Sequence, residues 1–222
     1  MSLTVNEKEF VWPEKYRPQT LNECILPNSV KDYFQGFIDA KNIPNLILHG
    51  GPGTGKTTVA IAALNDLGCQ FLKINASTNG NIETLRTEIH QFAMTVSFRG
   101  GRKYVILDEA DFLNAASTQP GLRAFMEDFS SNCGFILTAN YPDKLIPALR
   151  SRCTEIHFDI KKKDLSTLGS LYYNRIVEIL KLEEIEFEKA ALAGFIKKKF
   201  PDFRNILGEL QSYVLKTGKI DT

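Results

Sequence analysis

A glycine-rich stretch between an apolar run and a helical pattern constrains the fold of this chain more than any other feature. It reads HGGPGTGKTTVA over residues 49–60 and contains the pattern G-x-x-x-x-G-K-[ST] from Gly50 to Thr57. Glycines allow backbone N–H groups to turn inward around an anion, and the helix that follows adds the positive end of its dipole. This unit predicts a P-loop that binds nucleotide phosphates; a glycine-rich turn with a surface lysine is the simpler alternative.

The spacing of the P-loop assigns a role to its last residues. Lys56 is expected to reach the β- and γ-phosphates, and the Thr57 hydroxyl is expected to ligate Mg²⁺. The residues predicted to contact the nucleotide here are Gly50, Gly51, Pro52, Gly53, Thr54, Gly55, Lys56, Thr57 and Thr58.

Strand and helix patterns alternate through the first 160 residues. Short apolar runs recur at 46–49, 71–74, 103–108, 134–139 and 155–158, with helical patterns between them. This order predicts an α/β fold with a parallel sheet covered by helices on both faces. The remaining chain has three helical segments, roughly 162–181, 187–199 and 202–216, and no convincing strand. We therefore predict a P-loop domain over residues 1–159 and a small three-helix domain over 160–222.

Composition and charge exclude several classes of protein. The chain has 222 residues and a net charge of +1, so any contact with DNA is expected to be local rather than a coating of basic side chains. No apolar run approaches the roughly 18 residues of a spanning helix, and the N-terminus has no signal core. We expect no membrane partner and a cytoplasmic location. The four cysteines form no C-x-x-C pair and are expected to be buried free thiols.

A predicted buried strand ends in two adjacent carboxylates. The run from Lys103 leads to Asp108 and Glu109. Asp108 is placed to hold Mg²⁺ through its water shell, and Glu109 to orient or deprotonate the attacking water. A solvated turn is the alternative. The letters from Asp108 to Asp111 also spell the DEAD of one helicase family, whose other motifs are not visible in this chain.

Three polar residues further along complete the expected site. Asn140 follows an apolar strand, Arg152 lies in ALRSRC over 148–153, and Arg204 begins a helix of the second domain. The planar guanidinium of arginine suits a developing phosphoryl charge because it can donate two parallel hydrogen bonds to the phosphate oxygens. Each residue alone is a weak signal, and their order behind a P-loop is a stronger one.

Eight short motifs are spread along the chain. They are EKYRP (14–18), GGPGTGKTT (50–58), NAS (75–77), VILDEAD (105–111), LRAFME (122–127), TAN (138–140), SRC (151–153) and FPDFRN (200–205). Together these motifs resemble the small ATPase subunits of sliding-clamp loaders, a group within the AAA+ ATPases that includes replication factor C, archaeal loaders and the T-even phage loader. The similarity extends from about residue 5 to 215, and VNEKE, ECILP and SSNC look most like the phage subunit.

The resemblance implies an ATP hydrolase whose site is shared between subunits. Asn140 would be sensor 1, and Arg204 would be sensor 2, reaching ATP from the helical lid. Arg152 would be an arginine finger acting on ATP bound by the neighbouring subunit. Tyr16 and Arg17 would line the adenine pocket.

The same resemblance implies partners for the chain. These are other loader subunits in a ring, as a pentamer in full-length form, a sliding clamp and primer–template DNA, in the cytoplasm of a prokaryotic or phage-infected cell. Gln119 matches the position that couples the site to neighbouring subunits. Arg86 and Asn81 are the candidate DNA contacts, with the basic loop at 98–103 as a further one.

The chain departs from the family at its C-terminal end. Family members continue past the lid into a helical collar that holds the pentamer together. We expect its absence here to reflect a truncated chain or a partial reading frame rather than a divergent short form.

Two other functions are alternatives to a clamp-loader subunit. They are another AAA+ machine on DNA, such as an initiator or branch-migration motor, and a non-catalytic nucleotide-binding assembly subunit.

Overall fold

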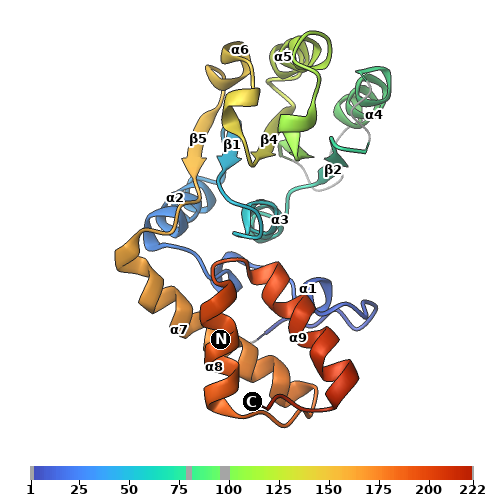
Figure 1. The fold of residues 1–222 in the computed structure, drawn as a ribbon. Coiled ribbons are helices and arrows are strands. Elements are labelled where there is room, and N and C mark those ends of the chain that lie inside the picture. The colour runs from blue at the N-terminus through green and yellow to red at the C-terminus, as the bar shows by residue number, and fades with distance from the viewer. Residues whose placement is uncertain (1–2, 79–81, 96–100, 222) are drawn as a thin grey trace.

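A parallel sheet of five strands forms the centre of the larger part of the molecule (Figure 1). The structure, a computed structural model, describes residues 3–78, 82–95 and 101–221. The strands lie in the order β2-β3-β4-β1-β5. They are β1 (Leu46–His49), β2 (Phe71–Asn75), β3 (Lys103–Asp108), β4 (Cys133–Ala139) and β5 (Thr154–His157). All five apolar runs are therefore strands, and every pairing between them is parallel, which confirms the predicted sheet.

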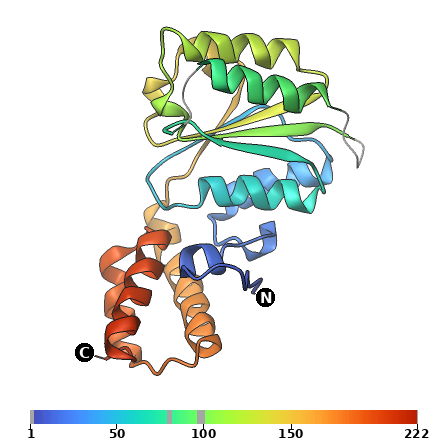
Figure 2. The same cartoon turned by 90° about the vertical axis from the view of Figure 1, so that its right-hand side faces the viewer.

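Helices cover both faces of this sheet (Figure 2). On one face α2 (Asn28–Asp39) and α3 (Lys56–Asp66) pack against Leu48 and Ile106. The other face is covered by α4 (Ile82–Met94), α5 (Thr118–Asp128) and the short α6 (Pro147–Arg150). All seven residues of β4 are buried, because this central strand is covered on both sides. That burial accounts for an apolar run without alternation.

A second hydrophobic core lies in a bundle of three helices below the sheet in Figure 1. The helices are α7 (Lys162–Leu182), α8 (Lys189–Lys199) and α9 (Phe203–Thr217). Ile176, Leu192 and Leu210 are almost fully buried where they meet. These helices agree closely with the three predicted segments.

The N-terminal segment packs against this bundle rather than against the sheet. Helix α1 (Trp12–Lys15) lies beside α9, and both Trp12 and Tyr16 are buried in the core of the bundle. The backbone N–H of Trp12 donates to Gln211 Oε1 at 3.0 Å, and Gln211 Nε2 donates to the carbonyl of Phe10 at 2.9 Å. The start of the chain therefore ties the lid helices to the segment that leads into the sheet domain.

Short 3₁₀ turns shape the loops around the sheet. They are η1 (Leu21–Glu23), η2 (Ala110–Phe112) and η3 (Pro142–Lys144). All four cysteines are free thiols, as expected, but only Cys24 and Cys133 are buried, whereas Cys69 and Cys153 are half-buried. Across the parts of the chain that the structure describes, no helix has both the length and the apolar character needed to cross a membrane.

Candidate nucleotide site

The predicted P-loop connects β1 to α3 through backbone that only glycine adopts readily. Gly53 has φ 69° and Gly55 has φ 91°, both in the left-handed region where a side chain is strained. Gly55 immediately precedes the first residue of α3, so its conformation sets the direction in which that helix begins. The loop lies at the carboxyl ends of the parallel strands, where open α/β sheets bind their ligands.

The ammonium group of Lys56 lies inside this loop. Its Nζ donates to the carbonyls of Gly50 at 2.9 Å and Gly51 at 2.8 Å, and to Asn140 Oδ1 at 2.9 Å. The residue is 8% exposed, and burial lowers the pKa of Lys56 to about 8 even though nearby carboxylates act in the opposite direction. The lysine is thus held at the end of β4 beside Asn140, where a phosphate group could replace its present acceptors.

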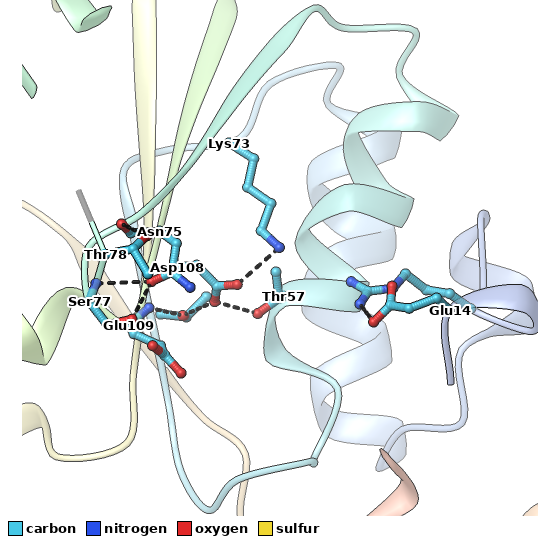
Figure 3. A network of polar contacts seen from close by, with 10 residues as sticks. Glu14, Thr57, Lys73, Asn75, Ser77, Thr78, Asp108 and Glu109 are labelled. Atoms are coloured by element: carbon cyan, nitrogen blue, oxygen red, sulfur yellow. Dashed lines mark hydrogen bonds and ion pairs between the residues drawn. The ribbon is translucent and has the colours of Figure 1, made fainter. Parts of the chain in front are cut away.

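Asp108, at the end of β3, is the centre of a polar network (Figure 3). Its Oδ1 accepts hydrogen bonds from Thr57 Oγ1 at 2.6 Å and Thr138 Oγ1 at 2.7 Å. Its Oδ2 lies 3.1 Å from the ammonium of Lys73 on β2. Burial alone would raise the pKa of Asp108, but these hydrogen bonds and the lysine outweigh it and lower the pKa. Asp108 is therefore a carboxylate at neutral pH.

Glu109 follows in an uncommon backbone conformation. Its φ is 58°, in the left-handed region, and its N–H donates to Thr138 Oγ1 at 3.0 Å. Non-glycine residues with positive φ carry strain that surrounding contacts must offset, and they cluster at functional sites. The turn brings Glu109 to the wall of the same cavity as Lys56 and Asp108.

A cavity of about 190 Å³ joins the P-loop to the lid helices. Its apolar part includes Pro13, Ile25 and Leu26, and the lid adds Tyr172 and Phe203. The predicted site residues that line it are Tyr16, Arg17, Pro52, Gly53, Thr54, Gly55, Lys56, Thr57, Thr58, Asp108, Glu109, Asn140 and Arg204. The fold thus brings together residues from the N-terminal segment, three strand ends and the lid.

Other predicted residues lie apart from this cavity. Gly50 and Gly51 flank it and contribute carbonyls to Lys56. Arg152 does not line the cavity; its guanidinium pairs with Glu127 on α5, with Nε 2.8 Å from Oε1. Arg86 on α4 lies over the ring of Phe125 at 6.0 Å. Asn81 and residues 98–100 of the predicted basic loop are outside the described residues.

Gln119 is fully buried and joins three loops at the edge of the sheet domain. Its Nε2 donates to the carbonyls of Leu113 at 3.0 Å and Lys144 at 2.9 Å, while its Oε1 accepts from the N–H of Ile146 at 2.7 Å. These contacts connect the loop after Asp108 and Glu109 with the segment that leads to α6. A coupling role for Gln119 stays a prediction.

Several residues of the site were not anticipated from the sequence. Lys73 and Thr138 contact Asp108 from the two neighbouring strands, and Arg175 of α7 lines the cavity while donating to the carbonyl of Glu23 at 3.3 Å. The one sequence feature that could have indicated Lys73 is that it is a lysine inside an otherwise apolar run. For Thr138 the only such feature is its position two residues before Asn140.

The residues at the strand ends fit a magnesium ion held together with phosphates. Mg²⁺ prefers hard oxygen ligands and is usually bound through one or two carboxylates and substrate phosphates. Thr57 and Asp108 present a hydroxyl and a carboxylate within 2.6 Å of each other. Among the described residues, no group of three or more His, Cys, Asp or Glu side chains could hold a metal ion.

Comparison with known proteins agrees with this geometry. Residues 46–160 match the AAA family, the ATPases associated with various cellular activities, and residues 172–222 match the lid domain of the sliding-clamp-loader large subunit. The chain is therefore an AAA+ P-loop ATPase with its lid, and it binds nucleotide.

The curated relatives narrow the class further. The chain is 41% identical to the sliding-clamp-loader large subunit of Escherichia phage RB69 over 96% of its own length and 68% of that protein. Identity to the Enterobacteria phage T4 protein of the same name is 42% with the same coverage. The replication factor C small subunit of Archaeoglobus fulgidus is 37% identical, covering 90% of this chain and 63% of that protein. The chain belongs to the sliding-clamp-loader family, which confirms the resemblance drawn from its motifs.

A solved structure with low identity supports the fold alone. The Thermotoga maritima RuvB Holliday junction branch migration motor aligns with a TM-score of 0.66 at 20% identity, over 93% of this chain and 69% of that one.

Proposed function

We propose that this chain is an ATP-hydrolysing subunit of a sliding-clamp loader in DNA replication, which assembles with other loader subunits and the clamp. The observation that carries the proposal is the position of the catalytic candidates. Lys56, Asp108, Glu109 and Arg204 line one cavity, whereas Arg152 lies outside it on the surface. A site that has its other catalytic candidates but not the proposed arginine finger, Arg152, suits an ATPase that a neighbouring subunit completes.

The proposed chemistry is mainly positioning and neutralisation of charge. Lys56 exchanges its carbonyl acceptors for phosphate oxygens, and Arg204 approaches the same phosphates from the lid. Thr57 and Asp108 would hold Mg²⁺, which when bound would neutralise charge on the phosphate oxygens. Glu109 accepts a proton from the attacking water or orients it, and Asn140 helps to fix the water beside the terminal phosphate.

The proposed base and ribose site lies between the N-terminal segment and the lid. Tyr16 and Arg17 line this part of the cavity together with Tyr172 and Phe203. Aromatic and apolar side chains offer flat surfaces for a purine. Because α1 packs against α9, the nucleotide would touch both parts of the molecule and hold the lid in one orientation.

The assembly proposed for this chain is a ring around primer–template DNA. In its full-length form the chain would make up a pentamer together with other loader subunits. Arg86 on α4 is the described candidate for a contact with the DNA backbone. A few phosphate contacts in each subunit add up around a ring, which is compatible with a net charge of only +1. The proposed place of action is the cytoplasm of a prokaryotic or phage-infected cell, because two of the similar relatives are phage proteins.

A complementation experiment tests the shared site. Glu109→Gln and Arg152→Ala are each expected to be inactive alone, because one lacks the residue that activates water and the other lacks the finger. When the two variants are mixed with primed DNA and a clamp, ATPase activity is expected to return and to rise faster than linearly with protein concentration. Arg123→Ala, which removes another arginine near Glu127, is the control and should retain activity.

Two results would contradict the proposal. If the unmutated chain hydrolyses ATP at a specific rate independent of concentration and Arg152→Ala keeps that rate, the site is complete within one subunit. If nucleotide affinity is unchanged in Lys56→Ala, the cavity is not the nucleotide site.

A further inference from the structure

Lys73 lies in the middle of β2 and directs its ammonium group at a predicted metal ligand. Its Nζ is 3.1 Å from Asp108 Oδ2 (Figure 3). In the sheet Lys73 is paired with Ile106 of β3, and Asp108 lies two residues further along β3. The lysine side chain therefore reaches diagonally across the strand pair, on the face that α3 covers, to the end where the P-loop begins α3.

The oxygens of Asp108 are divided between neutral and charged partners. Oδ1 accepts from the hydroxyls of Thr57 and Thr138, whereas Oδ2 is matched by the Lys73 ammonium. The carboxylate proposed to hold Mg²⁺ thus already has a cation beside it from its own chain. The Lys73 side chain is 37% exposed, compared with 13% for Asp108, so the lysine can move toward solvent while the carboxylate stays in place.

We propose that the Lys73 ammonium competes with Mg²⁺ for Asp108 and so sets the Mg²⁺ concentration that nucleotide binding requires. The inference rests on the proposed function and concerns the regulation of the same site. A Mg²⁺ ion lies about 2.0–2.1 Å from its ligand oxygens, or one water further away, and at either distance it would be repelled by the Lys73 ammonium that lies beside Oδ2. Lys73 must therefore withdraw when metal and nucleotide bind.

This competition makes Lys73 a positioning residue rather than a catalytic one. At low Mg²⁺ the ion pair keeps Asp108 neutralised and bound to Thr57. At high Mg²⁺ the lysine leaves, and Asp108 becomes available to the metal. The exposed stem of Lys73 keeps the cost of this exchange small, so the effect falls within the range of a partly exposed ion pair.

The test measures nucleotide binding as a function of Mg²⁺, without relying on hydrolysis. A fluorescent, non-hydrolysable ATP analogue is titrated with Mg²⁺ on the whole chain and on Lys73→Met, which keeps the side-chain length and removes the charge. We expect the half-saturating Mg²⁺ concentration to fall about two- to fivefold in Lys73→Met. Lys73→Arg, which keeps the charge, should remain close to the unmutated chain.

Two controls separate this effect from simpler ones. Lys197→Met removes the same charge from the last turn of α8, and its half-saturating Mg²⁺ concentration should not change. Thermal unfolding without Mg²⁺ checks that Lys73→Met is folded. If the ion pair were purely structural, its loss would change stability and leave the Mg²⁺ dependence unchanged.

The inference would be overturned if folded Lys73→Met had a half-saturating Mg²⁺ concentration equal to that of the unmutated chain, or higher. If the unmutated chain binds no analogue at any Mg²⁺ concentration, the proposed function itself fails.

Discussion

The ammonium group of Lys56 donates to Asn140 Oδ1 at 2.9 Å, which joins the P-loop to the end of β4. The contact uses Asn140 as an acceptor through Oδ1, and the Nδ2 of the same amide is its donor group. It also means that the lysine and the amide respond together when phosphate replaces one acceptor.

Replacing Asn140 with alanine should therefore slow hydrolysis more than it weakens binding. Loss of one oriented donor near a developing charge typically costs about 10²-fold or more in kcat. We expect a decrease of that size in steady-state ATPase activity of the assembled subunit, with nucleotide affinity within about threefold, since Lys56 can still exchange its carbonyl acceptors for phosphate oxygens. Asn132→Ala, in the exposed turn before β4, is the control. A large loss of affinity with unchanged kcat would assign Asn140 to ground-state binding instead.

The second prediction concerns the close approach of the lid to the P-loop. A Cβ at Gly53 would lie 2.0 Å from Asp202 Oδ1, and φ at this residue is 69°. Gly53→Ala is expected to lower the free energy of unfolding by about 1–2 kcal/mol from backbone strain, and to push the lid away from the loop. Nucleotide affinity should fall as well, and urea unfolding and an analogue titration measure the two effects.

Asp202 offers a matched variant for this prediction. Its side chain caps α9 by accepting from the N–H of Asn205 at 3.0 Å. Asp202→Ser keeps a cap with a shorter side chain, so it should be close to neutral by itself and should recover part of the loss caused by Gly53→Ala. Strict additivity of the two changes would show that the lid does not press on residue 53.

The sequence predicted those features that local chemistry determines. Gly53 and Gly55 take positive φ angles that favour glycine, and β4 is apolar apart from Thr138 because both its faces are covered. The packing of Trp12 against the lid could not be predicted in this way, because its hydrogen-bond partner Gln211 is 199 residues away. Lys73 was missed for a similar reason: its approach to Asp108 depends on the register between two strands.

A third prediction concerns pH and the attachment of the N-terminal segment to the lid. Glu183, at the end of α7, accepts from Lys15 Nζ at 2.7 Å and from the hydroxyl of Tyr16. Burial alone would raise the pKa of Glu183, but these contacts outweigh it and lower the pKa from its ordinary value of 4.5. The folded state therefore binds a proton less readily than the unfolded state. The stabilisation is complete above pH 4.5 and is lost as the pH falls through the lowered value.

Glu183→Gln should remove this pH dependence. At pH 7 it should lower the free energy of unfolding by about 1 kcal/mol or less, as for a partly exposed pair. The difference from the unmutated chain should shrink as the pH falls below the ordinary carboxyl value. Urea unfolding between pH 7 and 3.5 measures it, with Glu184→Gln as a control that removes the same charge one residue away. A difference that stays constant with pH would contradict the assignment.

The last prediction concerns the ion pair that holds Arg152. Its guanidinium contacts Glu127 on α5 and also donates through Nη1 to the carbonyl of Ala148 at 2.8 Å. To reach ATP on a neighbouring subunit, as proposed, Arg152 must leave Glu127. Glu127→Gln weakens the pair and should ease that departure. Because both side chains are exposed, the pair is worth only about 0.2–1 kcal/mol, and the protein concentration at half-maximal ATPase activity should fall by no more than about fivefold.

Arg150 supplies the control, since it also pairs with a glutamate: its Nε donates to Glu155 Oε1 at 2.8 Å and its Nη2 to Oε2 at 3.0 Å. Glu155→Gln removes a comparable charge from the neighbouring arginine and should leave the half-maximal concentration unchanged. A loss of activity in Glu127→Gln as severe as in Arg152→Ala would reverse the interpretation, because Glu127 would then be needed to aim the arginine rather than to restrain it. Either response, measured over a range of protein concentrations with primed DNA and clamp, distinguishes a restraint on Arg152 from a support for it.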